Sequence, residues 1–143
     1  MGMADEKKYR VLNRSSDLVI KVFGKTQAEL FANSAFALFD LLVDMEKVEV
    51  RDSLQLEVEG ADRDDLMVNW VRELLYLFQG SDYLVKEVRL QEIKENYVRG
   101  EVKGEKFDPD RHEIRREIHA VAYDQSRMEK TGDQWMAQLI FEL

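Results

Sequence analysis

The chain has 143 residues, of which 45% are hydrophobic and 35% charged, a balance typical of one folded globular domain. It contains no cysteine, which excludes disulfide bonds, thiolate metal sites and cysteine nucleophiles. No apolar run approaches the roughly 20 residues of a membrane-spanning helix, and the first residues lack the apolar stretch of a secretory signal. We therefore expect a cytoplasmic protein that does not enter the membrane.

The charge balance is acidic, with 21 Lys and Arg residues against 29 Asp and Glu residues and a net charge of −8. Because affinity for nucleic acid depends on neutralising backbone phosphates, we expect no direct binding of nucleic acid. An acidic domain is better suited to cations or to the basic surface of another protein.

The first predicted elements are a strand and a helix. Apolar residues alternate over 17–23, which predicts a strand. Thr26 and Glu29 have the spacing of a capping box, and apolar residues then recur at three- and four-residue steps. This pattern predicts an amphipathic helix from 27 to about 43.

A second strand and a second helix follow. Residues 54–59 alternate between apolar and polar side chains, as in a half-buried strand. Asp62 is a good N-cap, and a broad apolar stripe runs from there to Gly80, where we expect the helix to end.

The last part of the chain is predicted to be mainly strands, with turns at 95–96 and 132–133. Period-two patterns or β-branched residues predict strands over 85–93, 97–102, 114–123 and 135–143. Early helices and a later antiparallel run indicate an α+β domain of two layers, with two amphipathic helices packed on a largely antiparallel sheet. No linker or repeat divides the chain, so we expect one domain over 9–143 after a flexible N-terminus, 1–8.

Few residues have the spacing of an active site. There is no phosphate-binding glycine loop and no marked nucleophile. His112 is interpreted as a residue that fixes a polar loop or faces solvent. Arg111, Arg115 and Arg116 are interpreted as part of a solvated face.

His119 is the second histidine of the chain. If 114–123 is a strand, Glu117 and His119 share one face with Val121 and Tyr123, while the small apolar residues between them face the core. His119 is then either a half-exposed partner of a carboxylate from a neighbouring strand or a functional group.

Two carboxylates, Asp17 and Glu142, occupy unusual places in apolar strands. A buried charge is costly unless it is paired or bound to a metal, so a divalent cation such as Ca²⁺ or Mg²⁺ would suit these oxygen ligands. Alternatively, Asp17 caps a turn and Glu142 belongs to a frayed chain end.

The order of motifs resembles the archease family over 9–143, nearly the whole chain. The segments that carry this resemblance are Asn-Arg-Ser-Ser-Asp at 13–17, Phe-Gly-Lys-Thr at 23–26, Ala-Phe-Ala-Leu-Phe-Asp at 35–40, Asp-Leu-Met-Val-Asn-Trp at 65–70, Glu-Leu-Leu-Tyr-Leu-Phe at 73–78, Gly-Glu-Lys-Phe-Asp at 104–108, Glu-Ile-His-Ala-Val-Ala-Tyr at 117–123 and the terminal strand at 135–143.

This resemblance implies a strand-helix-strand-strand module with added strands. It also implies an accessory protein, not an enzyme, whose partner is the RNA-splicing ligase that acts on tRNA halves. Archease promotes guanylylation and turnover of this ligase. The family holds a divalent metal with acidic residues of the opening motif and the C-terminal strand, near a lysine of the penultimate strand.

The chain departs from the family at those positions. The opening motif usually reads Asp-His-Thr-Ala-Asp, whereas 13–17 keeps only Asp17. His119 stands in place of the lysine, Asp124 in place of a histidine, and Glu142 in place of the terminal aspartate. The arginine within 13–17 places a positive charge beside the cation, so we expect cation binding to be weakened or lost.

Three hypotheses follow. The first is a divergent archease that activates an RNA ligase, with Asp17 and Glu142 as cation ligands and His119 in place of the lysine. The second is an archease-fold binding or chaperone-like module that has lost the metal site and the ligase role. The third is an enzyme that uses Glu117, His119 and Asp124 as acid and base groups.

Overall fold

The structure is a computed structural model that describes residues 8–13 and 16–143. Most of the expected flexible N-terminus, 1–7, therefore lies outside the described residues. In chain order the elements are β1 (Tyr9–Asn13), β2 (Asp17–Gly24), α2 (Gln27–Leu42), the 3₁₀ helix η1 (Met45–Lys47), β3 (Asp52–Glu59), α3 (Arg63–Ser81), β4 (Tyr83–Lys94), β5 (Tyr97–Lys106), β6 (Ala120–Val121), β7 (Arg127–Thr131) and β8 (Gln134–Glu142).

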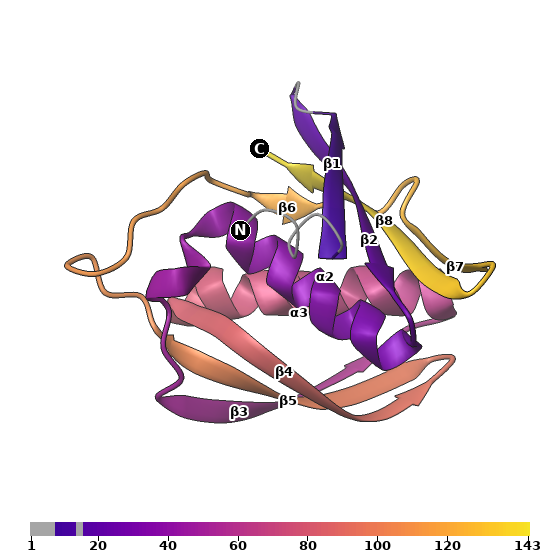
Figure 1. Cartoon of the computed structure of the whole chain (residues 1–143), viewed down its shortest axis with the longest axis horizontal. Helices are drawn as coiled ribbons and strands as arrows, with labels where there is room; N and C mark the ends of the chain where they lie inside the picture. Colours follow the sequence, from indigo (N-terminus) through magenta and orange to yellow (C-terminus); the bar gives the residue numbers. More distant parts are fainter. Residues whose placement is uncertain (1–7, 14–15) are drawn as a thin grey trace.

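The strands of the described residues form two antiparallel sheets with the two helices between them (Figure 1). One sheet has the order β1-β2-β8-β6, with β7 also paired to β8, and the other has the order β3-β5-β4. Helix α2 packs on β2 on one side and on β4 on the other. The α+β class and the packing of two helices on antiparallel strands are thus confirmed, while the strands that the sequence placed in one sheet are divided between two.

Both helices begin at the residues that the sequence predicts. The Oγ1 atom of Thr26 accepts a 3.0 Å hydrogen bond from the backbone N–H of Glu29, whose carboxylate accepts one from Lys25. Asp62 caps α3 through the N–H of Asp65. Helix α3 continues past Gly80 to Ser81, and Asp82 ends it in the left-handed conformation with a φ of 56°.

The core lies between the two helices and the inner faces of both sheets. Buried residues occur on more than one side of α2, as its place between two sheets requires. Trp70 of α3 is fully buried, its ring meets Phe31 edge to face at 5.8 Å, and its indole N–H donates to the Phe31 carbonyl oxygen at 3.0 Å. Neither these helices nor any other described helix is long and apolar enough to cross a membrane.

The strand predicted over 114–123 is wrong except at β6, and the residues before it form a loop (Figure 1). The backbone N–H groups of this segment bond to different parts of the fold, with Arg115 donating to Leu42 and His119 donating to Glu142. The alternation of apolar and polar residues over 114–123 cannot reveal that these backbone groups bond to residues far away in the sequence. Val121 is consequently buried together with Ile118, whereas strict alternation places these two residues on opposite faces.

Candidate functional site

Asp17 and Glu142 lie directly opposite each other, at the start of β2 and the end of β8. Opposite residues of an antiparallel pair share one face of the sheet, so both carboxylates extend from the same side. The neighbouring pair, Leu18 with Phe141, is buried toward the helices, which places the carboxylates on the outer face. We refer to Asp17 and Glu142 as the carboxylate pair.

His119 reaches the carboxylate pair through its backbone. Its N–H donates to the Glu142 carbonyl oxygen at 2.7 Å, and the next residue, Ala120, pairs with Glu142 in β6. The His119 side chain is exposed, as are those of Glu117 and Asp124. No hydrogen bond or ion pair joins these three side chains to one another within the described chain. The structure thus places the His119 backbone beside that of Glu142, but within the described chain it assembles no acid–base group from Glu117, His119 and Asp124.

The carboxylate pair has the right chemistry for a hard cation but supplies few ligands. Ca²⁺ takes about six to eight oxygen atoms and Mg²⁺ about six. Over 8–13 and 16–143, no group of three or more Asp, Glu, His or Cys side chains is placed to hold a metal ion. Arg14 and Ser15 of the opening motif lie outside the described residues. The pair therefore fits a cation only if water fills most of the coordination sphere.

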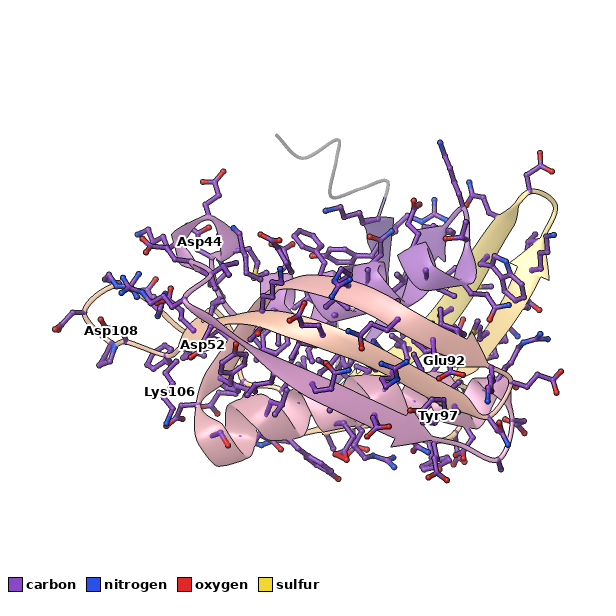
Figure 2. The ribbon with its side chains drawn as sticks, turned by 90° about the horizontal axis from the view of Figure 1, so that it is seen from below. Asp44, Asp52, Glu92, Tyr97, Lys106 and Asp108 are labelled. Carbon is purple, nitrogen blue, oxygen red and sulfur yellow. The ribbon has the colours of Figure 1, made fainter. Side chains whose placement is uncertain are left out.

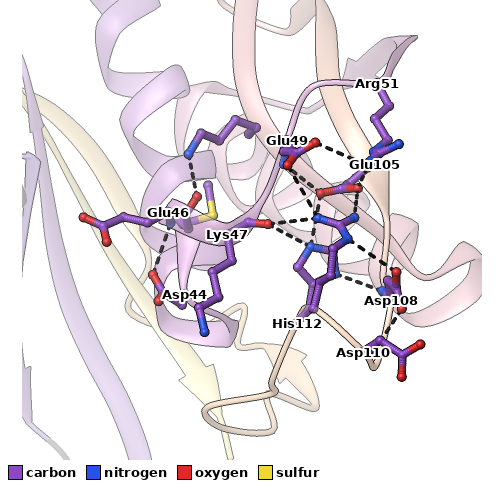
Figure 3. Close-up of polar contacts among 12 residues, drawn as sticks. Asp44, Glu46, Lys47, Glu49, Arg51, Glu105, Asp108, Asp110 and His112 are labelled. Carbon is purple, nitrogen blue, oxygen red and sulfur yellow. Dashed lines mark hydrogen bonds and ion pairs between the residues drawn. The ribbon is translucent and has the colours of Figure 1, made fainter.

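A second polar cluster surrounds Glu105 at the end of β5 (Figure 3). The Glu105 side chain is only 3% exposed. Its carboxylate accepts hydrogen bonds from the backbone N–H of Glu49 at 2.7 Å, from Nε of Arg51 at 3.0 Å and from the guanidinium of Arg111. It also lies 3.1 Å from Nε2 of His112. We call Glu105, Arg111 and His112, together with Arg51, the Glu105 cluster.

His112 is buried, so it fixes the loop and does not face solvent. Its Nδ1 accepts a 2.9 Å hydrogen bond from the backbone N–H of Asp108, so the ring proton of a neutral imidazole belongs on Nε2. From there it can be donated to the Lys47 carbonyl oxygen at 3.0 Å and to Glu105. One imidazole thus joins three segments of the chain.

The pKa of Glu105 is lowered to about 2 by opposing effects. Burial is the largest single effect and raises the pKa, because it disfavours the charged form. The hydrogen bonds from Arg111 and from the Glu49 N–H, with the positive charge of Arg111, together lower the pKa by more. The carboxylate therefore stays ionised inside the fold.

The loop beyond the Glu105 cluster is tied to the end of α2. Arg115 donates its backbone N–H to the Leu42 carbonyl oxygen at 2.7 Å, and its side chain pairs with Asp44 at 3.7 Å. The Arg116 guanidinium donates to the Leu41 carbonyl oxygen at 2.9 Å, beside a helix end that has no basic residue of its own. The solvated face predicted for Arg111, Arg115 and Arg116 is wrong for Arg111 and Arg116, whose partly buried guanidinium groups hold the loop that leads to His119. Arg115 is exposed, as predicted.

Comparison with known proteins matches this fold and this chain to one group. The sequence model of the archease protein family matches residues 9–143. The chain belongs to the archease family. Protein archease of Methanosarcina mazei is 34% identical over 141 residues, which cover 96% of this chain and 97% of that protein. Protein archease of Pyrococcus furiosus is 37% identical over 130 residues, covering 88% and 92%.

Solved structures agree on the fold. The solution structure of Methanobacterium thermoautotrophicum protein 1598 has a TM-score of 0.80 at 24% identity and covers 96% of this chain and 99% of its own. A Thermotoga maritima structure, described as an archease and possible chaperone, has a TM-score of 0.61 at 14% identity, covering 92% and 94%. At these identities the likeness shows the archease fold alone.

The Glu105 cluster is not predictable as a unit from the sequence, which shows Glu105 only as part of a family motif. Its partners come from Glu49, Arg51 and the following loop. The sequence does offer one local signal, which is the glycine, Gly104, directly before Glu105 in β5. A Cβ atom on Gly104 would lie 1.8 Å from the Leu84 carbonyl oxygen, so only glycine fits this close strand approach.

Proposed function

We propose that this archease-family protein is an accessory factor that activates an RNA-splicing (tRNA) ligase in the cytoplasm by promoting the ligase's guanylylation and turnover. It is not itself the ligating enzyme in this proposal. Family membership over 9–143 supports it. The observation that carries it is the alignment of Asp17 with Glu142 at one end of the sheet, with His119 bonded to the same residue.

In this proposal the protein's own groups act by contact with the ligase. The carboxylate pair, with the exposed side chain of His119 on the segment that bonds to the Glu142 backbone, would form the polar end that meets the partner. The Glu105 cluster and the Arg116 contact hold the loop that delivers His119, so they position the site without touching the partner. A divalent cation, bound weakly between the two carboxylates, would add a positive charge to this end.

The test is multiple-turnover RNA ligation by the ligase of the source organism, with substoichiometric amounts of this protein. Stimulation supports the proposal. Glu142→Gln and His119→Ala should each reduce stimulation about tenfold or more if the polar end meets the ligase. Glu113→Gln is the matched control, because Glu113 is exposed and forms no ion pair within the described chain. No stimulation by folded protein at any ratio contradicts the proposal.

A second candidate is a binding or chaperone-like module with the same fold and no ligase role. One observation favours it: the described residues offer only a pair of carboxylates where a metal site would need more ligands. In the same assay this candidate predicts no stimulation. It also predicts that Ca²⁺ or Mg²⁺ leaves the melting temperature unchanged.

A further inference from the structure

The long edge strand β3 is open to pairing along most of its length. It forms one edge of the β3-β5-β4 sheet, whose exposed face is seen in Figure 2. Its eight residues pair with β5 in unbroken register, and six of them are exposed. Unpaired edges of this kind are templates for another strand, and proteins commonly protect them with bulges or short lengths.

The other edge strands of the described fold carry that protection, and β6 and β7, at one edge of the first sheet, have only two and five residues. β4, at the opposite edge of the same sheet, has register shifts between Val85 and Glu87 and between Leu90 and Glu92. β1 has only five residues and a shift between Val11 and Asn13. β3 is therefore the long, regular edge strand of the described sheets.

Two contacts fix which backbone groups of β3 are free. The Gly60 N–H donates to the Asn96 carbonyl oxygen across the β3–β5 pair at 2.9 Å. Because hydrogen-bonding direction alternates along an antiparallel strand, the odd-numbered residues of β3 direct their N–H and C=O groups away from β5. The Asn69 side chain confirms this phase, since it donates to the outward carbonyl oxygen of Glu59 at 2.9 Å. Ser53, Gln55 and Glu57 remain open to a partner strand.

A groove of about 400 Å³ lies along this edge, between β3 and α3. Its lining includes the carboxylates of Glu57, Glu59 and Glu73 and the rings of Tyr76 and Tyr97. Neither Glu59 nor Glu73 forms an ion pair with any residue that the structure describes, although Glu73 is half-buried on α3.

One guanidinium borders the groove and does not neutralise these carboxylates. Arg72 stacks on the ring of Tyr123 at 4.5 Å and donates to the Val121 carbonyl oxygen. The groove thus combines two carboxylates without ion pairs in the described chain, a third, Glu57, that accepts a hydrogen bond from the Tyr97 hydroxyl, and the ring of Tyr76, which is 52% exposed. Leu54, farther along β3, is 40% exposed.

We propose that β3 is a docking edge for an extended, basic segment of a partner protein, which adds as a fourth strand to the β3-β5-β4 sheet. Backbone bonds to Ser53, Gln55 and Glu57 would fix the segment. Its apolar side chains would cover Leu54 and Tyr76, and its Lys or Arg side chains would meet Glu57 and Glu73. This inference does not depend on the ligase proposal.

The test uses full-length protein labelled with ¹⁵N and a capped nine-residue peptide that alternates lysine with valine. We expect chemical-shift changes confined to β3, Tyr76 and Glu73, and slower hydrogen exchange of the Ser53, Gln55 and Glu57 amides. A peptide that alternates glutamate with valine should bind at least tenfold more weakly. A lysine–valine peptide with a central proline should also bind at least tenfold more weakly.

Two variants separate strand addition from simple charge attraction. Gln55→Pro removes an outward N–H while leaving the bonds to β5, and it should weaken peptide binding about tenfold. Glu73→Gln should weaken it about threefold, whereas Glu113→Gln, with the same charge change elsewhere, should not. Equal binding of the proline peptide, shift changes away from β3, or no binding at millimolar peptide would each overturn the proposal.

Discussion

The imidazole Nε2 of His112 lies 3.1 Å from Oε2 of Glu105, and both side chains are buried. The contact joins the end of β5 to a loop that has almost no regular structure of its own. Because the same carboxylate binds Arg111 and the Glu49 backbone, one glutamate organises the polar interior at this end of the molecule.

Glu105→Gln should lower the free energy of unfolding by about 2–4 kcal/mol, because it removes one partner of a buried ion pair and leaves hydrogen-bond donors poorly matched. Urea unfolding followed by circular dichroism measures this loss. Glu113→Gln removes the same charge at an exposed position, so its free energy of unfolding should stay within about 0.5 kcal/mol of that of the parent protein. A loss below about 1 kcal/mol in Glu105→Gln would show that the cluster contributes little.

The contribution of Glu105 should depend on pH. Its pKa falls from 4.5 to about 2 on folding, so its stabilisation is complete above pH 4.5 and is lost as the pH falls toward 2. The shift corresponds to about 3 kcal/mol. Unfolding of the parent protein and of Glu105→Gln should be compared at several pH values. The difference in unfolding free energy should narrow between pH 4.5 and 2, and a constant difference contradicts the assignment.

Gly104→Ala should destabilise the fold by about 3 kcal/mol or more, because its Cβ would lie 1.8 Å from a backbone oxygen of β4 that cannot move independently. Gly80→Ala is the matched control. Gly80 lies in α3, and a Cβ added there would meet no atom within 4 Å, so alanine should stabilise by about 0.5–1 kcal/mol. Thermal unfolding should therefore show a lower melting temperature for Gly104→Ala and a higher one for Gly80→Ala. An unchanged melting temperature in Gly104→Ala would contradict the close approach of β4 to β5 at this residue.

Asp17→Ala should abolish any rise in melting temperature caused by Ca²⁺ or Mg²⁺. With a dissociation constant of about 1 mM, a cation concentration of about 10 mM would stabilise the parent protein by about 1.4 kcal/mol, which raises the melting temperature by about 3–6 °C. The Glu142→Gln variant should behave like Asp17→Ala, whereas Glu113→Gln should keep the full rise. An unchanged rise in Asp17→Ala excludes Asp17 as a ligand.

Local signals predict the helices well. Thr26 and Asp62 cap α2 and α3 through the hydrogen bonds expected from sequence, because capping involves residues only three apart. The turn at 95–96 joins two expected strands, and the turn at 132–133 joins the expected strand β8 to β7, which the sequence analysis did not predict. Long-range order is harder to predict. The loop before β6 is fixed by Leu41, Leu42 and Glu105, and the two leucines are far from it in the sequence.

In the candidate site, too, individual residues are predictable from the sequence but their long-range arrangement is not. Asp17 and Glu142 are recognisable individually as carboxylates in apolar strands, but their direct pairing depends on the register of β2 with β8. The burial of Glu105 is not predictable either, because its partners come from separate segments of the chain. Charge in a sequence shows which groups are present, while burial depends on what the fold places around them.

The central strand β8 comes last in chain order, and it pairs with β2 near the beginning. During synthesis, β1 and β2 must therefore wait for more than a hundred intervening residues before their sheet can close. The β3-β5-β4 sheet has no such delay, because all its strands come from the middle of the chain. The polar end formed by Asp17 and Glu142 is consequently assembled only after β8 has left the ribosome, so a chain that stops before β8 could never present it.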